Sequence, residues 1–407
     1  MPNNNKLKIF NDPIYGFITI PNTLIFDLIR HKYFQRLRRI TQMGMSYLVY
    51  PGAHHTRFHH ALGCMHLMQK AVQVLRFKGV EISKEEESAL YVAILLHDIG
   101  HGPFSHALEH SLINQLTHEQ ISLIFMKKLN EEFDGQLTKA IEIFEGIYHR
   151  KFMCQLISSQ IDMDRSDYLK RDSFYTGVSE GNINSERLIT MLHVVDDQLV
   201  IEEKGIYSIE KFLVARRFMY WQVYLHKTGL VAEQLLVKVL LRAKSLINKG
   251  NIIEASEPLL FFLKNQIHFE NFDGSAIDRF SSLDDYDVIH ALKLWQQQDD
   301  FVLSNLSQMI INRDLLSIKF YDKPNIRQLN KHKKRLKAQY DLDEDELSYF
   351  VFSGKVTHQA YQEDDQIKIL QKKGKLKSLS KISEKLSLKS LKKPVTKYYL
   401  CFPKNNM

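Results

Sequence analysis

The sequence predicts a mainly α-helical protein with a small C-terminal region of mixed helices and strands. From about residue 22 to residue 320, apolar residues recur mostly at helical spacing, whereas after about residue 345 short apolar runs alternate with turn residues. With 407 residues, 44% of them hydrophobic, the chain is long enough for one large domain with additions. We therefore expect an N-terminal hairpin or strand segment over 1–25, a helical core over 26–320 and a C-terminal α+β appendage over 321–407.

The two ends of the chain carry the strand patterns. NDPIYGFITIP (11–21) places an Asn-Asp-Pro turn before an alternating stretch, which predicts a small hairpin or an edge strand. Near the C-terminus we expect a strand in LSYFVFSGKV (347–356), two strands turning at Gly374 in QIKILQKKGKLKSLS (366–380), a short helix in SEKLSLKSL (383–391) and a last strand in TKYYLCF (396–402).

Helix signals fill the region between these ends. Ser83 and Glu86 form a capping-box pattern that opens an apolar helix running to Leu96, and Gly100 is placed to stop it. Thr56 is placed to cap a helix over about 57–77. Further helices are predicted as long elements over 153–172 and 208–248 and as shorter ones between 255 and 318.

Composition excludes several classes of protein. No apolar run reaches the roughly 18 residues of a membrane span, and the N-terminus lacks the apolar core of a secretory signal. Three scattered cysteines fit neither a disulfide framework nor a zinc ribbon. We therefore expect a cytoplasmic protein without a membrane partner.

The net charge of +8 is concentrated at one end. Residues 371–404 hold 11 lysines and one glutamate, so the remainder of the chain is slightly acidic. A lysine-rich C-terminus allows weak contact with nucleic acid, although such a run most often forms a solvated surface.

Histidines gather in one stretch of the chain. Ten of the 18 lie between His54 and His118, and HDIGHGPFSH (97–106) holds three of them. An isolated His-Asp pair is weak evidence, but several imidazoles beside carboxylates predict a metal site. His97 and Asp98 supply one nitrogen and one oxygen ligand, and the others must come from RFHH (57–60) and IDMDRSDYLKRD (161–172). Spacing alone does not choose between the two histidines of RFHH or between the first two aspartates of the later motif.

Two imidazoles and two carboxylates form a mixed nitrogen and oxygen ligand set with room for water. Such a set favours Mn, Fe, Mg or Ni over tetrahedral zinc. Water bound to such an ion loses its proton more easily and becomes a nucleophile near neutral pH. A second Mg²⁺ carried in with substrate phosphates is compatible with the same site.

Taken in order, RFHHALG, HDIGHGPFSH, HEQ (118–120) and IDMDRSDYLKRD resemble the signature of the HD-domain phosphohydrolases. The resemblance is to the branch that contains the deoxynucleoside triphosphate (dNTP) triphosphohydrolases. It extends to NDPIYGFI, FQRLRRITQMG, YPGAHHTRFHH and YLHKTG, and so covers roughly residues 8–235. It implies a helical HD-domain core and hydrolysis of dNTPs to deoxynucleoside and tripolyphosphate, by attack of metal-activated water on the α-phosphorus.

The resemblance also implies roles for individual residues. The metal ligands would be His60, His97, Asp98 and Asp164. His101 and His118 would contact phosphates near the scissile bond, while His106 would donate a proton to the leaving group and Glu109 would orient it.

Substrate binding is carried over in the same way. Arg57 would hold a phosphate beside the metal, and Asp172 would accept a hydrogen bond from the 3′-hydroxyl. Met43 beside the 2′ carbon would disfavour ribose. The other implied substrate contacts are Gln42, Arg165, Tyr168, Arg216 and Tyr224. Family members work as dimers or larger assemblies, so the resemblance implies a homo-oligomer.

Some relatives are activated by a guanine nucleotide bound between subunits. Lys8, Ile9, Gln35 and Arg38 agree with that site, but Arg30 stands where those relatives carry an aspartate. A cation cannot accept the N–H groups of guanine, so we expect no guanine-specific activation.

Two other functions are compatible with parts of this pattern. One is an HD-type phosphodiesterase or phosphatase acting on a cyclic dinucleotide, an alarmone or a nucleoside monophosphate. The GYP-type signalling enzymes usually carry Lys after HDIG, whereas this chain has His101 and no GYP motif. The other is a nucleic-acid-binding scaffold with a vestigial HD site, but all four ligand positions are filled.

Overall fold

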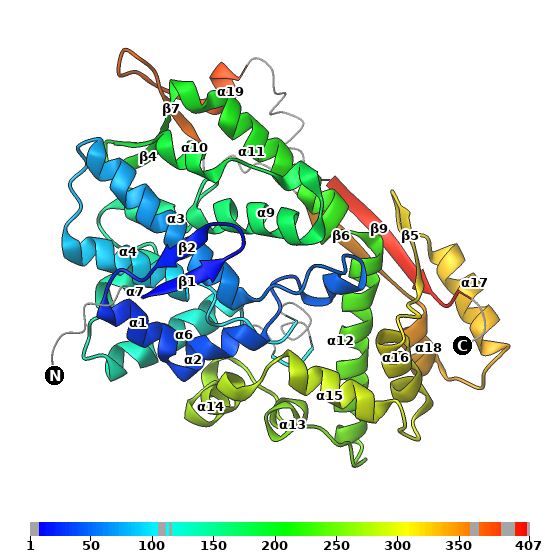
Figure 1. The fold of residues 1–407 in the computed structure, drawn as a ribbon. Helices are drawn as coiled ribbons and strands as arrows, with labels where there is room; N and C mark the ends of the chain where they lie inside the picture. Colours follow the sequence, from blue (N-terminus) through cyan, green and yellow to red (C-terminus); the bar gives the residue numbers. More distant parts are fainter. Residues whose placement is uncertain (1–7, 105–110, 114–115, 359–365, 384–394, 405–407) are drawn as a thin grey trace.

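The computed structural model describes residues 8–104, 111–113, 116–358, 366–383 and 395–404. Helices form the body of the molecule, and within the described residues three small sheets lie around it (Figure 1). The predicted fold class, mainly α with a small C-terminal region containing strands, is confirmed. No helix in these ranges is long and apolar enough to cross a membrane.

The N-terminal hairpin forms as predicted. Strands β1 (Ile9–Asp12) and β2 (Gly16–Thr19) pair antiparallel. The Asp12 carboxylate accepts the backbone N–H groups of Ile14 and Tyr15 at 2.8 and 3.0 Å, which closes the turn. The Gln69 amide donates to the Thr19 carbonyl at 3.0 Å and ties the hairpin to α3 (Arg57–Phe77), in front of which the hairpin lies in Figure 1.

The two central helices begin where the capping signals placed them. Helix α3 starts after Thr56, whose backbone N–H donates to Nδ1 of His59 at 3.3 Å. Helix α4 (Lys84–Leu96) starts with the predicted reciprocal pair: Glu86 N–H donates to Ser83 Oγ, and Ser83 N–H donates to the Glu86 carboxylate. Most of the residues of α4 are buried, and this apolar segment delivers His97 to the interior.

Shorter helices surround this centre. The segment before α3 contains α1 (Thr23–Arg30), α2 (Lys32–Gln35) and two 3₁₀ turns, Arg36–Arg39 and Gly44–Leu48. After α4 come α6 (His118–Glu132), α7 (Thr138–Phe144) and, later, α10 (Ser185–Thr190). The predicted short helices between 255 and 318 are α13 (Glu257–Lys264), α14 (Gly274–Ser282), α15 (Asp285–Trp295) and α16 (Phe301–Ile311).

Both long predicted helices are interrupted. The segment 153–172 contains the end of α8 (Lys151–Ile157) and most of α9 (Met163–Thr176). Asp162 starts α9 because its side chain accepts the N–H groups of Ser159 and Arg165. The segment 208–248 is divided into α11 (Ile206–Met219), a π-helical turn (Tyr220–Tyr224) and α12 (Lys227–Asn248). His226 caps α12 by accepting the N–H of Thr228.

One hairpin in the predicted helical core was missed. Strands β3 (Leu192–Val195) and β4 (Gln198–Glu202) pair antiparallel across a two-residue turn. Asp196 and Asp197 both have positive φ angles, 49° and 56°, which fits the tight turns that connect hairpin strands.

The C-terminal region is paired with the core. Strand β4 pairs in parallel with β7 (Lys368–Leu370), which pairs with β8 (Leu376–Ser378) across the turn at Gly374, as predicted. Strand β9 (Val395–Phe402) lies between β5 (Ser317–Tyr321) and β6 (Phe352–His358). Each of these two sheets contains residues from both sides of residue 320, the predicted end of the helical core. Backbone hydrogen bonds therefore join the C-terminal region to the core.

The predicted strand over 347–356 is only half correct. Its first residues belong to α18 (Glu344–Phe350), because Asp343 and Glu346 form a capping box that opens a helix. The last predicted strand is β9. Most of the helix predicted over 383–391 lies outside the described residues. The described part of the C-terminal region also contains the helices α17 (Ile326–Lys337) and α19 (Leu379–Ile382).

Candidate metal centre and substrate site

The first histidine of the site lies on α3. His60 is fully buried, one turn into the helix. Its Nδ1 lies 2.8 Å from Oδ2 of Asp167 on α9. Its Nε2 lies 3.1 Å from Oδ1 of Asp164 and 3.6 Å from Oδ2 of Asp98. Because Asp167 holds one ring nitrogen, the other is oriented toward the two carboxylates.

The second histidine comes from the end of α4. Nδ1 of His97 lies 2.7 Å from the Ile94 carbonyl, which fixes this nitrogen as the donor. Its Nε2 lies 3.5 Å from Oδ1 of Asp98 and 3.5 Å from Oδ1 of Asp164. This buried atom makes no hydrogen bond within the described part of the chain.

The turn that follows α4 is held from two sides. Ser122 on α6 donates its hydroxyl to the His97 carbonyl at 2.8 Å and accepts the Gly100 N–H at 2.9 Å. Arg36 donates to the Ile99 carbonyl at 2.9 Å. A side chain at Gly100 would place Cβ 2.2 Å from the Ser122 backbone nitrogen, so glycine lets α6 approach the turn. Helix α4 already ends at Leu96, before this glycine.

The structure therefore brings together His60, His97, Asp98 and Asp164 from three elements. Two Nε2 atoms and two carboxylates face one another, each histidine is fixed through its other nitrogen, and one buried nitrogen is left without a hydrogen bond. These features suit a divalent cation with mixed nitrogen and oxygen ligands, and His60 and Asp164 with His97 and Asp98 are the residues that would hold it. Their role as ligands stays a prediction.

Electrostatics favour a cation at the same place. Burial raises the pKa of Asp98 and Asp164, but the neighbouring histidines outweigh burial and hold both pKa values below the ordinary aspartate value. Burial lowers the pKa of His97, but Asp98 and Asp164 outweigh it, so this pKa is raised. Both carboxylates are therefore ionised and can bind a cation.

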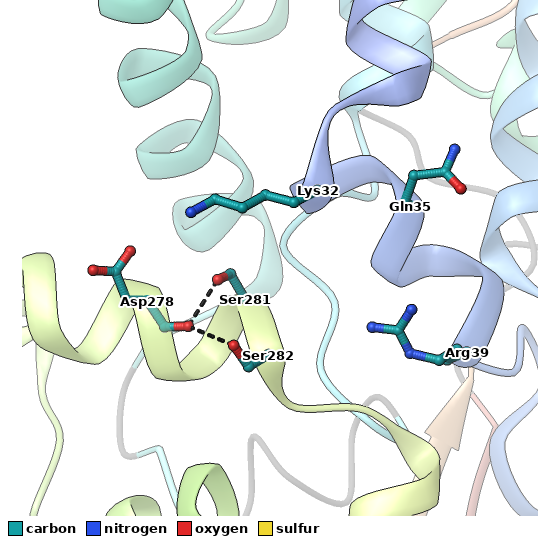
Figure 2. Close-up of a pocket in the computed structure, with 6 residues that line it drawn as sticks. All are labelled: Lys32, Gln35, Arg39, Asp278, Ser281 and Ser282. Carbon is teal, nitrogen blue, oxygen red and sulfur yellow. Dashed lines mark hydrogen bonds between the residues drawn. The ribbon is translucent and has the colours of Figure 1, made fainter.

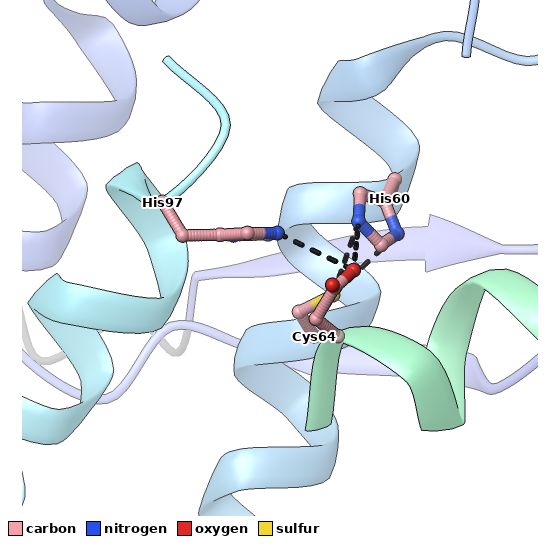
Figure 3. Close-up of side chains that lie close together, drawn as sticks. His60, Cys64 and His97 are labelled. Carbon is pink, nitrogen blue, oxygen red and sulfur yellow. Dashed lines mark hydrogen bonds and ion pairs between the residues drawn. The ribbon is translucent and has the colours of Figure 1, made fainter. Parts of the chain in front are cut away.

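Cys64 is also close to His60, from the next turn of α3, as Figure 3 shows. Its sulfur lies 3.5 Å from Nδ1 and 3.6 Å from Nε2 of His60. Nearly equal distances to both nitrogens place the sulfur over the ring and away from the in-plane direction in which Nε2 offers its lone pair. Cys64 is therefore better described as a packing neighbour of His60 than as a ligand, although its sulfur is near the same centre.

A second group of side chains adjoins the first. Oδ1 of Asp98 lies 3.2 Å from Nε2 of His101, and the rings of His101 and His118 stack with centroids 3.9 Å apart. Burial and the charge of Arg57 hold the pKa of His101 well below its ordinary value. The two imidazoles predicted to contact phosphates thus lie side by side, and Asp98 lies close to histidines of both groups.

The three predicted phosphate-binding arginines differ in their surroundings. Arg57, at the start of α3, contacts the Asp98 carboxylate. Arg165 contacts Asp162 and donates to the Ser159 carbonyl at 2.7 Å. Arg216 on α11 is buried, and its Nε and Nη1 have no hydrogen-bond partner among the described residues. Arg216 is thus the cation most available to an anion.

The predicted sugar-binding residues form one network. Oδ2 of Asp172 accepts the Tyr224 hydroxyl at 2.6 Å, and its Oδ1 lies 2.7 Å from Nε2 of His55. His55 stacks on Tyr175 with ring centroids 4.4 Å apart. The ring of Tyr168 lies 6.1 Å from that of Tyr224.

Among the remaining predicted contacts, Tyr168 lies between this region and the metal centre, whereas Gln42 and Met43 have other neighbours. The ring of Tyr168 also lies 6.5 Å from that of His60, so this tyrosine lies between the two parts. Gln42 donates its backbone N–H to the His55 carbonyl at 2.9 Å, and its side-chain oxygen is buried without a partner among the described residues. Met43 is half-buried against the core. His106 and Glu109 lie outside the described residues.

Sequence reasoning missed two charged residues of the site, Asp167 and Arg171. Asp167 lies 2.8 Å from His60 and accepts two hydrogen bonds from Arg171, at 2.8 and 3.0 Å. Their spacing of four residues on one helix is a signal for such a pair. Burial raises the pKa of Asp167, but Arg171 and His60 outweigh it and lower this pKa to about 2.

A separate surface pocket of about 450 Å³ lies between α2 and α14 (Figure 2). Lys32, Gln35 and Arg39 line one side, and Asp278, Ser281 and Ser282 line the other. Arg39 contacts Asp284, so much of the charge of this pocket is compensated within the protein.

The residues of the expected activator site are engaged with one another. Gln35 donates to the Ile29 carbonyl at 2.7 Å, and Arg38 donates to Gln35 at 3.0 Å. Lys8 and Arg30 both lie over the ring of Phe26, at 3.0 and 5.6 Å from its centroid. Arg30, which stands where those relatives carry an aspartate, therefore shares the Phe26 ring with Lys8.

A helical fold that gathers His…His-Asp…Asp at one buried centre indicates a phosphohydrolase of the HD class. Comparison with known proteins agrees: the HD domain model matches residues 57–172, and the model of the HD associated region matches residues 183–257. This chain belongs to the HD-domain phosphohydrolases, in the branch related to the dNTP triphosphohydrolases.

Individual relatives extend over most of the chain. It is 48% identical to a phosphohydrolase from Bacteroides thetaiotaomicron, whose crystal structure superimposes with a TM-score of 0.95 over 98% of this chain and 100% of that one. It is 37% identical over 325 residues to an uncharacterized protein of Bacillus subtilis. This match covers 77% of this chain and 72% of that protein.

A more distant relative has a named activity. A Dictyostelium discoideum protein, the deoxynucleoside triphosphate triphosphohydrolase SAMHD1 homolog, is 33% identical over 270 residues. The match covers 61% of this chain and 51% of that protein, so this chain spans about half the length of that relative.

Proposed function

We propose that this protein hydrolyses deoxynucleoside triphosphates to deoxynucleoside and tripolyphosphate. The observation that carries the proposal is the convergence of His60, His97, Asp98 and Asp164 beside the buried Arg57. The buried Arg216 interacts electrostatically with Tyr168, whose ring lies 6.5 Å from that of His60. A cation site alone suits many hydrolases. Cationic side chains around it suit a substrate with several phosphates.

In the proposed reaction, water attacks the α-phosphorus and the bond to the 5′ oxygen breaks. A bound divalent cation would make that water a better nucleophile and would withdraw charge from the phosphate. Asp167 and the Ile94 carbonyl hold the two histidines in one tautomer each, so both Nε2 atoms remain available as ligands.

The chain's own side chains would bind the polyphosphate. Arg216 offers two guanidinium atoms without hydrogen-bond partners among the described residues, and Arg57 lies against Asp98. Burial and the charge of Arg57 hold the pKa of His101 well below its ordinary value, which favours the neutral imidazole as an N–H donor to a phosphate oxygen. The 5′ oxygen leaves with a proton, for which we propose His106 as the donor and Glu109 as its orienting partner.

At the sugar end, Asp172 would accept a hydrogen bond from the 3′-hydroxyl. Each of its oxygens already has one partner, Tyr224 or His55, and a carboxylate oxygen accepts more than one hydrogen bond. Both partners hold the carboxylate in one orientation, which favours a defined sugar position. Tyr168, Gln42 and Met43 complete this end in the proposal, whereas Arg165 must share its guanidinium with Asp162.

The test is product analysis. The purified protein is incubated with each dNTP and Mn²⁺ or Mg²⁺, and deoxynucleoside with tripolyphosphate is expected. His97→Ala is expected to abolish turnover, whereas His290→Ala, which changes an exposed histidine on α15, should leave it unchanged. Release of monophosphate with pyrophosphate would refute the proposed reaction, and full activity of His97→Ala would refute the proposed centre.

Two partner assignments belong to the same proposal. We propose a homo-oligomer, to be measured as the molar mass in solution by light scattering, and a monomeric active enzyme would exclude it. We also propose that the lysine-rich segment 371–404 contacts nucleic acid weakly. Binding of single-stranded DNA should then weaken steeply with salt and be lost on deletion of 371–407.

A further inference from the structure

A chain of buried charges runs from the N-terminal hairpin to the metal centre. Asp12 at the end of β1 accepts a hydrogen bond from Nη1 of Arg171 at 2.8 Å. Nε and Nη2 of Arg171 donate to the two oxygens of Asp167, at 2.8 and 3.0 Å. Asp167 in turn lies 2.8 Å from Nδ1 of His60.

These groups are removed from solvent. The side chains of Arg171 and Asp167 are fully buried, and that of Asp12 is 4% exposed. A buried guanidinium requires nearby negative charge, and here two carboxylates divide its donors between them. Arg171 therefore cannot be satisfied by Asp167 alone.

The backbone of α3 leaves room for this arrangement at Gly63. A Cβ there would lie 2.1 Å from Oδ1 of Asp167 and 2.3 Å from Nη2 of Arg171. Since Gly63 is one turn beyond His60, the helix that carries the histidine also admits the ion pair that orients it.

The hairpin reaches both helices that carry ligands. The Gln69 side chain of α3 donates to the Thr19 carbonyl of β2, while Arg171 of α9 binds Asp12 of β1. Asp12 thus has two separate tasks: its Oδ1 closes the hairpin turn, and its Oδ2 receives Arg171.

We propose that Asp12 is a positioning residue for the metal centre, acting on His60 through Arg171 and Asp167. Asp12 takes part of the charge of Arg171 and so leaves Asp167 a stronger hydrogen-bond acceptor for His60. A stronger acceptor at Nδ1 makes Nε2 a better ligand and holds the ring in place. This inference rests on the proposed metal centre but not on the identity of the substrate.

Asp12→Asn separates the two tasks. Asparagine keeps an oxygen for the turn but presents an NH₂ group, a second donor, to Arg171. Direct outer partners of metal-binding histidines contribute about 10–100-fold to metal affinity, and Asp12 lies two steps further out. We therefore expect the dissociation constant for Mn²⁺, measured without substrate by titration calorimetry, to rise by about 3–10-fold.

The matched control is Asp300→Asn. Asp300 also pairs with a buried arginine, Arg242, and its side chain also accepts a backbone N–H at a helix start, that of Leu303 in α16. It should lower the melting temperature without changing Mn²⁺ affinity. Asp167→Asn should weaken Mn²⁺ more than Asp12→Asn. If Asp12→Asn gives no folded protein, Asp12→Ser, which keeps a turn acceptor, replaces it.

The outcomes separate cleanly. A rise of threefold or more in Asp12→Asn, with an unchanged value in Asp300→Asn, supports the positioning role. A smaller rise, or an equal rise in both variants, overturns it. If the wild-type protein bound no Mn²⁺, the proposed metal centre itself would fail and this inference with it, whereas failure to hydrolyse dNTPs would leave the Mn²⁺ comparison intact.

Discussion

Replacing Gly100 with alanine tests how the turn after α4 is built. The added Cβ would lie 2.2 Å from the Ser122 nitrogen and 2.3 Å from the His118 carbonyl oxygen. Both contacts are backbone atoms of α6, so no side-chain rotation relieves them. An ordinary carbon contact needs roughly 1 Å more, and α6 or the turn must move by about that distance.

Overpacking of a core costs about 1–3 kcal/mol, and two close backbone contacts place Gly100→Ala near the upper value, about 3 kcal/mol. The same movement displaces His118 and the His97-Asp98 turn. Misplacement of catalytic groups by about 1 Å lowers turnover by about 100-fold. We therefore expect both a lower free energy of unfolding in urea and a loss of dNTP hydrolysis.

Gly229→Ala is the matched control. Gly229 lies in the first turn of α12 with open space around its Cβ position and no positive φ angle. Alanine there should raise stability by about 0.5–1 kcal/mol, because glycine costs that amount within a helix. The reasoning is refuted if Gly100→Ala keeps normal turnover and its free energy of unfolding stays within about 1 kcal/mol of the wild-type value. Such a change would be smaller than the expected cost of overpacking.

Two further substitutions probe charge. Arg216→Met removes the buried arginine whose Nε and Nη1 lack hydrogen bonds among the described residues. Because one charged contact with the substrate is lost, kcat/KM for dNTPs should fall about 10–100-fold, while stability is kept. Equal kinetics for Arg216→Met and for the control Arg217→Met would contradict this. Glu86→Gln tests pH dependence: burial raises the pKa of Glu86, but contacts with Ser83, Arg150 and Tyr148 outweigh it and lower this pKa below 4.5. Its stabilisation is therefore full above about pH 4.5 and lost as pH falls through the lowered pKa, so urea unfolding should show a wild-type advantage at pH 7 that shrinks at acidic pH. An advantage independent of pH would exclude this cause.

The order of helices could be predicted because their starts are local events. Ser83 and Glu86 stand three residues apart and satisfy each other, and the structure places α4 where they predict it. The interruptions at 158–162 and 225–226 were missed because apolar spacing continues through them. Only the side chains of Asp162 and His226, which cap the next helix, mark the breaks. The pairing of β5 with β9 depends on residues far apart in sequence, which no local pattern reports.

The choice of predicted metal ligands was limited in the same way, because local spacing does not report contacts between distant residues. Spacing left His59 and His60, and Asp162 and Asp164, as alternatives, and only the family resemblance chose between them. In the structure His59 bonds to Thr56, and Asp162 starts α9 and holds Arg165. Both rejected residues are occupied by helix capping, which is a physical reason for the choice.

Two buried arginines explain why the centre is held so firmly. Arg171 links the partner of His60 to Asp12 in the hairpin, and Arg36 links the Ile99 carbonyl to that of Leu283 at the end of α14. Each arginine thus ties a segment that carries predicted ligands to a distant part of the chain. Among the described residues, neither arginine forms a hydrogen bond to one of the four predicted ligands. Since a buried arginine that loses one partner keeps an uncompensated charge, loosening either distant segment should disturb the metal centre before the helices themselves unfold. We therefore expect the N-terminal hairpin and the α14–α15 junction to support the proposed metal centre, although neither holds one of its four predicted ligands.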